Sequence, residues 1–331
     1  MSTSMQGTAP DPREPGRIGP PGFPELPPGS GRAVPGRGQI FVRTTDGPAA
    51  DAPCLVLLHG LTATADLNWF AAYEPLAQRY RLIAPDLRGH GGGPTAARFR
   101  LDDAADDVAA LLRALDAGPA IAVGYSMGGA VAQELWRRHP ALVSGLVLCA
   151  TSADYREKTT RGRYVEQPRR VLVAALGRLL PAGLRAKALA KLRAASTTRL
   201  QAGTDAESDV QRWAARELQR SDPFQVAAAG AALRRYVSPG DLAAVRVPVS
   251  LVITTQDEVV PTAEQRQLAE LLPASTTVHE VDAGHGVFVE EPDAFVPALV
   301  AACADVVERI QASAGRRGPG RPEGQATERT V

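Results

Sequence analysis

Short apolar runs alternate with segments of helical periodicity along most of this chain. The runs have the length of buried strands, and turn residues such as Gly, Pro and Asp follow most of them. We expect strands at residues 39–44, 54–58, 81–84, 120–123, 146–150, 249–254 and 277–281. We expect helices at residues 68–80, 102–116, 127–139 and 293–312. This alternation predicts an α/β fold, with a mostly parallel central sheet and helices on both faces.

The alternation stops between residues 153 and 240, where the pattern is helical and basic. This segment holds 17 Lys and Arg against 8 Asp and Glu, although the whole chain has a net charge of only +1. Because strand signals resume directly after it, we expect a helical cap inserted after the strand at residues 146–150 and covering the ligand-binding strand ends. The alternative is that these helices simply extend the core.

Two parts of the expected cap, residues 169–180 and 184–192, mix apolar and cationic side chains. Interfacial helices have this composition, so weak contact of the cap with an anionic membrane surface is one hypothesis. A basic face toward solvent over an apolar face toward the pocket explains the same pattern.

Composition divides the remaining chain into a core and two ends. Residues 1–36 are rich in Pro and Gly and have no hydrophobic period, which predicts a disordered leader. Residues 313–331 predict a similar disordered tail. The sheet-forming core then comprises residues 37–152 and 241–312, and 331 residues suffice for one large domain with an insertion.

Composition also disfavours several classes of protein. The net charge of +1 gives no reason to expect a nucleic-acid partner. Cys54, Cys149 and Cys303 lie in apolar contexts without paired spacing, which argues against a disulfide scaffold or a metal site. No apolar run approaches the roughly 18–20 residues that span a bilayer, and the N-terminus has no signal-peptide pattern. We therefore expect a cytoplasmic protein.

A glycine-rich turn around Ser126 is the first candidate for chemistry. Residues 124–128 are Gly-Tyr-Ser-Met-Gly, between a predicted strand and a predicted helix. The spacing Gly-x-Ser-x-Gly is typical of a nucleophile elbow, a tight turn that pushes the serine hydroxyl into solvent. The pentapeptide alone is also compatible with an ordinary glycine-rich turn.

A nucleophilic serine needs a base, and the base needs an acid that orients it. Among the five histidines, His285 is the strongest candidate for the base, because it lies in a glycine-flanked loop directly after a predicted strand. The other four have positions that suggest structural roles: His59 at a strand end, His90 in a loop, His139 at a helix end and His279 within a strand.

The acid is expected after a strand between Ser126 and His285. Asp257 occupies such a strand end. Its neighbour Glu258 is expected to point toward solvent, and Asp86, which precedes the serine, is expected to fix a loop. Both are alternatives for the acid.

Backbone N–H groups rather than side chains form an oxyanion hole. We expect one from Met127, directly after the serine at a helix N-terminus, and one from Leu61, in the loop after His59. Four aromatic residues are candidates for pocket lining: Trp69, Phe70, Tyr125 and Trp213. Core packing explains the presence of such aromatic side chains equally well.

Taken as a set, these motifs resemble the α/β-hydrolase family. The resemblance covers roughly residues 38–312. It rests on the following motifs, in the family's order of Ser, Asp and His: His59-Gly60, Asp-Leu-Arg-Gly-His-Gly at 86–91, Gly-Tyr-Ser-Met-Gly-Gly at 124–129, Asp257 with Pro261 behind it, and Gly284-His285.

The resemblance implies a role for each candidate residue. Ser126 would be the nucleophile, His285 the general base and Asp257 the orienting acid, while Leu61 and Met127 would supply the oxyanion hole. The resemblance implies neither a cofactor nor a metal.

The serine also narrows the chemistry. Dehalogenase-like and epoxide-hydrolase-like members of the family carry Asp at the elbow, and Gly-Leu-Thr after His59 differs from the Gly-Gly-Gly of hormone-sensitive-lipase relatives. We expect a carboxylesterase or lipase that cleaves a small-molecule or lipid ester through an acyl-serine. The alternatives are a C–C bond hydrolase, a lactonase, a cofactor-free perhydrolase, an amide hydrolase, or a non-catalytic binding protein on the same scaffold.

Overall fold

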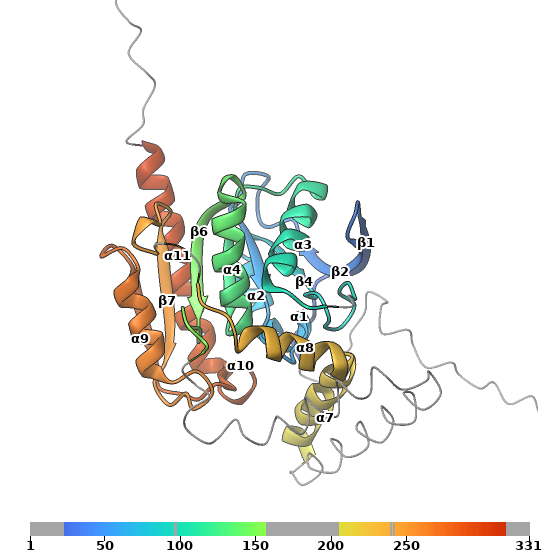
Figure 1. Ribbon diagram of the computed structural model, residues 1–331. Helices are drawn as coiled ribbons and strands as arrows, with labels where there is room; N and C mark the ends of the chain where they lie inside the picture. The colour runs from blue at the N-terminus through green and yellow to red at the C-terminus, as the bar shows by residue number, and fades with distance from the viewer. Residues whose placement is uncertain (1–22, 96–97, 157–204, 239, 241, 316–331) are drawn as a thin grey trace, which may run out of the picture.

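An eight-stranded sheet forms the centre of the computed structural model, which describes residues 23–95, 98–156, 205–238, 240 and 242–315 (Figure 1). The sheet order is β1-β2-β4-β3-β5-β6-β7-β8. The strands are β1 (Gly29–Val34), β2 (Gly38–Thr45), β3 (Cys54–Leu58), β4 (Arg81–Pro85), β5 (Ala120–Tyr125), β6 (Val143–Cys149), β7 (Val249–Thr254) and β8 (Thr277–Val281). Two pairings, β1 with β2 and β2 with β4, are antiparallel and the other five are parallel, so the predicted mostly parallel sheet is confirmed.

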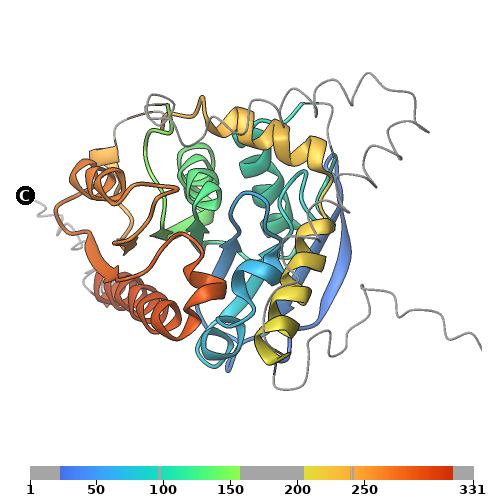
Figure 2. The same ribbon diagram turned by 90° about the horizontal axis from the view of Figure 1, so that it is seen from below.

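Helices cover both faces of this sheet, as the alternation predicted (Figure 2). One face carries α3 (Leu101–Ala114), α4 (Met127–Arg138) and α9 (Thr262–Leu271), and the other carries α1 (Ala65–Trp69), α2 (Tyr73–Ala77), α10 (Val287–Glu290) and α11 (Pro292–Gly315). Short 3-10 turns lie at η1 (Pro140–Leu142) and η4 (Leu242–Ala244). All six residues of β5 are buried, and alternate side chains enter the two core layers, as expected for a strand covered on both sides.

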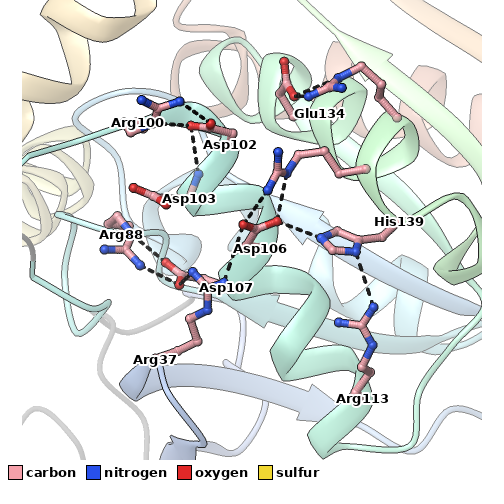
Figure 3. Close-up of polar contacts among 12 residues, drawn as sticks. Arg37, Arg88, Arg100, Asp102, Asp103, Asp106, Asp107, Arg113, Glu134 and His139 are labelled. Atoms are coloured by element: carbon pink, nitrogen blue, oxygen red, sulfur yellow. Dashed lines mark hydrogen bonds and ion pairs between the residues drawn. The ribbon is translucent and has the colours of Figure 1, made fainter.

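Charged residues fasten α3 to α4 and to the neighbouring loops (Figure 3). Asp106 on α3 accepts bonds from Arg138 (2.7 Å) and His139 (2.8 Å), at the end of α4. The Arg138 guanidinium, together with His139, holds the pKa of Asp106 at about 2. Asp107 pairs with Arg88 at 2.6 Å, so the end of the elbow helix and the loop after β4 are both tied to α3.

The N-terminal part of the chain departs from the sequence analysis. Residues 1–36 were expected to form a disordered leader, but Gly29–Val34 form β1 and pair with β2 along their whole length. Only Val34 of this strand is buried, so backbone pairing holds β1 without the apolar alternation that a sequence pattern needs. Residues 1–22 of that prediction, and 316–331 of the predicted tail, lie outside the described residues, while α11 continues to Gly315.

Two helices, α7 (Asp205–Gln219) and α8 (Pro223–Leu233), lie between β6 and β7 in the chain. In Figure 1 both helices lie at the bottom of the molecule, below the sheet. The α7 helix packs against α1, and α8 packs against α3. Residues 169–180 and 184–192, on which the membrane hypothesis rests, lie outside the described residues, so that hypothesis and the cap itself stay predictions. Within the described part of the chain, no helix is long and apolar enough to cross a bilayer.

Candidate active site

The turn between β5 and α4 holds Ser126 in an unusual backbone conformation. Its φ is 52° and its ψ is −116°, a positive φ that a side chain with a Cβ rarely adopts. The residue is 5% exposed, so it is buried rather than open to solvent as the elbow motif predicts. Backbone strain of this kind costs of order 1–3 kcal/mol and persists where the surroundings hold it in place.

The neighbouring glycines make this turn sterically feasible. A Cβ on Gly124 would lie 2.4 Å from the Gly128 carbonyl oxygen, and a Cβ on Gly128 would lie 2.0 Å from the Leu58 carbonyl oxygen. The start of α4 therefore approaches β3 and β5 more closely than any larger residue allows, which is why the elbow needs glycine at these positions.

We expect Gly128→Ala to destabilise the fold by about 3 kcal/mol or more, because the added methyl group has no room beside the Leu58 carbonyl. Urea unfolding gives the free energy of unfolding. Gly31→Ala is the matched control, since its Cβ would meet nothing nearer than 3.4 Å. Equal unfolding midpoints for the two variants would contradict the close packing described for the elbow.

Hydrogen bonds hold the strained serine from both sides. Its carbonyl accepts from the Thr151 hydroxyl at 2.8 Å and from the Tyr155 hydroxyl at 3.1 Å. Its N–H donates to the Cys149 carbonyl at 2.9 Å. The turn is therefore locked to the end of β6, which leaves only the Ser126 side chain free to act.

Hydrogen bonds connect the side chains of Ser126, His285 and Asp257 in series. His285 Nε2 lies 3.0 Å from Ser126 Oγ, and His285 Nδ1 lies 2.7 Å from Asp257 Oδ2. A carboxylate only accepts, so Nδ1 carries the proton and Nε2 is left to accept the serine proton. The three residues follow β5, β8 and β7, whose carboxyl ends lie along the same edge of the parallel sheet.

Asp257 is held more firmly than a single partner would require. Its Oδ1 accepts from the N–H groups of Val259 and Val260, both at 2.8 Å. Its Oδ2 also accepts from Thr254 (2.8 Å) and Gln265 (3.0 Å). Neither Thr254 nor Gln265 is predictable from the sequence, because nothing in a linear pattern shows that α9 places its Gln beside the end of β7.

The other histidines bond to groups elsewhere. His59 bonds to the Gly60 carbonyl and the Leu87 N–H, His90 to the Arg88 carbonyl, His139 to Asp106, and His279 to Asp305. Burial lowers the pKa of His59 to about 3 and that of His90 to about 4, so neither is suited to accept a proton near neutral pH.

The alternative acids lie in different surroundings. Glu258 is exposed. Asp86 is buried and accepts from the N–H groups of Ala65 (2.9 Å) and Gly92 (2.8 Å), which fastens two loops. Burial raises the pKa of Asp86 to about 6, against the opposing effect of the Arg220 guanidinium 3.6 Å away. Neither carboxylate bonds to His285 among the described contacts.

The expected oxyanion donors lie on either side of the serine. Met127 is the first residue of α4, and Leu61 follows Gly60, at which a Cβ would lie 3.5 Å from the Ser126 Cβ. Within the described residues, neither the Met127 N–H nor the Leu61 N–H donates to a protein acceptor. The α8 helix lies against this loop, since a Cβ on Gly230 would be 3.4 Å from Leu61 Cδ2.

The aromatic candidates are packed in the core. Trp69 is fully buried and meets Tyr125 edge-to-face at 6.4 Å. The Tyr125 hydroxyl donates to the His285 carbonyl at 2.7 Å, so this ring supports the histidine loop. Phe70 and Trp213 form a separate cluster with Phe23. Pocket lining by these rings therefore remains a prediction.

Metal-binding side chains do not gather anywhere in the described part of the chain: no group of three His, Cys, Asp or Glu could hold an ion there. The three cysteines are unpaired, and burial raises the pKa of the Cys54 thiol to about 11.

A family model of the alpha/beta hydrolase fold matches residues 53–292, which include Ser126, Asp257 and His285. The chain belongs to the α/β-hydrolase family. The pimeloyl-[acyl-carrier protein] methyl ester esterase of Aromatoleum aromaticum is 34% identical over 255 residues, which cover 73% of this chain and 94% of that protein. The protein of the same name from Nitrosomonas europaea is 28% identical over 270 residues, which cover 78% of this chain and 96% of that protein.

Solved structures of other α/β-hydrolases share the fold. The enol-lactonase from Burkholderia xenovorans superposes with a TM-score of 0.67 at 23% identity, covering 83% of this chain and all of that one. The family resemblance expected from the motifs is therefore confirmed.

Proposed function

We propose that this α/β-hydrolase is a serine hydrolase that cleaves a carboxylic ester through an acyl-serine intermediate. The observation that carries the proposal is the continuous chain of hydrogen bonds from Ser126 through His285 to Asp257, with the serine on a strained turn. An ordinary glycine-rich turn needs no histidine at 3.0 Å from its serine hydroxyl.

In the proposed reaction, Ser126 Oγ attacks the ester carbonyl carbon while His285 Nε2 takes the hydroxyl proton. Asp257 keeps the imidazole oriented and stabilises its positive charge. The N–H groups of Met127 and Leu61 donate to the oxyanion of the tetrahedral intermediate. Its collapse expels the alcohol, which receives the proton from His285.

The second half of the reaction uses the same groups. A water molecule loses a proton to His285 and attacks the acyl-serine carbonyl. The resulting intermediate releases the acid and returns the proton to Ser126 Oγ. Both halves of the proposed reaction use only groups of the protein, the substrate and water.

Two observations support an ester as the substrate and the insert as its cover. Relatives named methyl ester esterases match most of the chain, one at 34% identity. Residues 153–240 form the cap in this proposal, because α8 already lies against Leu61 beside the serine. The cap would then shape the acyl pocket.

The proposed function is tested with p-nitrophenyl esters of rising acyl length, together with the methyl esters of the same acids. We expect turnover of at least the short acyl members, and a preference for long chains would indicate a lipase. Amides of the same acids, and lactones of the corresponding hydroxy acids, are the controls. Turnover of an amide or a lactone with none of any open-chain ester would overturn the assignment in favour of those classes.

A further inference from the structure

Asn68, the only asparagine in the chain, is buried beside the proposed oxyanion loop. Its side chain is 2% exposed, and its Oδ1 accepts a 2.8 Å hydrogen bond from the Gly60 N–H. A Cβ on Gly60 would lie 3.5 Å from Asn68 Oδ1 and also 3.5 Å from the Ser126 Cβ. The Asn68 carboxamide therefore acts on the residue that faces the serine.

Gly60 is bonded at its other end as well. The His59 ring lies with Nδ1 2.8 Å from the Gly60 carbonyl, while its Nε2 accepts from the Leu87 N–H. His59 therefore carries its proton on Nδ1 and donates it to Gly60. Burial lowers the pKa of His59 to about 3, so this neutral form persists at neutral pH.

The two bonds together determine where the Leu61 N–H points. In a trans peptide, the carbonyl of one residue and the N–H of the next point in opposite directions. The Leu61 N–H thus points away from the His59 ring. Gly60 has no Cβ and could otherwise rotate freely, so a bond to its carbonyl alone leaves φ unrestrained. Asn68 supplies the missing restraint at the N–H.

Asn68 is itself held in place by α1. Asp66 on that helix forms a buried pair with Arg43, including a 2.8 Å bond from Arg43 Nη2. Thr64 caps the helix by accepting from the Leu67 N–H at 3.1 Å, and its hydroxyl donates to Glu217 of α7 at 2.7 Å. The carboxamide is therefore presented from a rigid support.

The second polar atom of Asn68 costs stability. Its Nδ2 is buried, and no acceptor in the described part of the chain bonds to it, which is destabilising for a buried donor. Within the described residues, the only hydrogen bond of this carboxamide is therefore the one that it accepts from the Gly60 N–H.

We propose that Asn68 is a positioning residue, which fixes Gly60 so that the Leu61 N–H is aimed at the substrate oxyanion. The expected effect on activity rests on the proposed function. The restraint that Asn68 places on Gly60, which we call the Gly60 clamp, can be measured without any substrate.

The test compares Asn68→Leu, which keeps the number and branching of the side-chain heavy atoms but removes the acceptor, with Gln133→Leu as the matched control. Gln133 is also a buried amide with one unpaired atom, but it bonds to the Gly129 and Ser152 carbonyls on the other side of the serine turn. We expect Asn68→Leu to lower kcat between about 10- and 100-fold with KM nearly unchanged, because misalignment of an oxyanion donor costs less than the roughly 10²- to 10³-fold lost when a donor is removed. Gln133→Leu should leave kcat near wild type.

Hydrogen exchange supplies the readout that is independent of activity. The Gly60 amide should exchange faster in Asn68→Leu, with the amides of β5 and β6 unchanged. Asn68→Asp keeps an oxygen for the Gly60 N–H, so it should restore slow exchange and covers the case in which the leucine variant folds poorly. Unchanged exchange in Asn68→Leu, or a rise in KM at constant kcat, would overturn the proposal. Altered exchange in a protein that hydrolyses no ester would instead overturn the proposed function and leave the clamp standing.

Discussion

Ser126→Ala is expected to lower ester turnover by at least roughly 10⁴-fold while leaving the fold intact. Alanine keeps the Cβ, so the strained backbone at φ 52° is no worse accommodated than with serine. The bonds that hold the turn go to the backbone carbonyl and N–H of residue 126, so they remain in the variant. Only the bond to His285 is lost. Steady-state hydrolysis of a p-nitrophenyl ester measures the effect.

Covalent labelling separates this result from a general loss of structure. A fluorophosphonate should label wild type at Ser126 and should not label Ser126→Ala. Ser250→Ala is the control, because Ser250 is a fully buried serine at the start of β7 that bonds to Thr277 instead. If Ser126→Ala is still labelled, or keeps a tenth of the wild-type activity, the nucleophile is another residue. An unlabelled, inactive wild type would favour a binding protein on the hydrolase scaffold.

Sequence patterns were sufficient for the features that local sterics and strand order decide. The Gly-x-Ser-x-Gly turn between a buried strand and a helix made Ser126 a candidate, and Asp257 and His285, in the family's order along the chain, favoured it over an ordinary glycine-rich turn. Asp257 and His285 each follow a buried strand, and parallel strands bring their carboxyl ends to one edge. Their proximity was therefore predictable without knowledge of the loop conformations.

Features that depend on tertiary contacts were not predictable in this way. Arg43 and Asp66 form a buried ion pair, with Arg220 of the insert 3.5 Å from the same carboxylate. Charged residues are ordinarily expected at the surface, and nothing in the spacing of these three positions indicates that they meet. The strand β1 was not predicted either. Backbone hydrogen bonds pair it with β2, so its sequence needs no apolar pattern.

The same limit applies to the residues that support the site. Asn68 falls in a segment whose apolar period predicts a helix. The same helix would be predicted with any polar residue at this position, so the pattern does not single out Asn68. Gln265 lies on a surface helix, eleven residues after Thr254, yet its amide bonds to Asp257 at 3.0 Å. Supporting residues act through three-dimensional contacts, so only coordinates could identify them.

His285 is the residue on which both halves of the proposed reaction depend. Its ring is about one-fifth exposed and stands between the fully buried Asp257 carboxylate and the serine. The histidine contributes little to packing in this position. Asp257 keeps four other hydrogen bonds when the ring is removed, so loss of the imidazole does not leave a bare buried charge.

His285→Ala should therefore lower kcat by roughly 10⁴-fold with a small change in KM and in the unfolding midpoint, since among the described residues only His285 bonds to the serine hydroxyl. His279→Ala is the matched control: that histidine lies on β8 in the same sheet, pairs with Asp305 at 2.8 Å, and should leave kcat unchanged. Ester hydrolysis and urea unfolding of both variants provide the measurements. Near-wild-type kcat in His285→Ala would show that the hydrogen bond to Ser126 is structural, because a general base cannot be dispensable while its nucleophile is required.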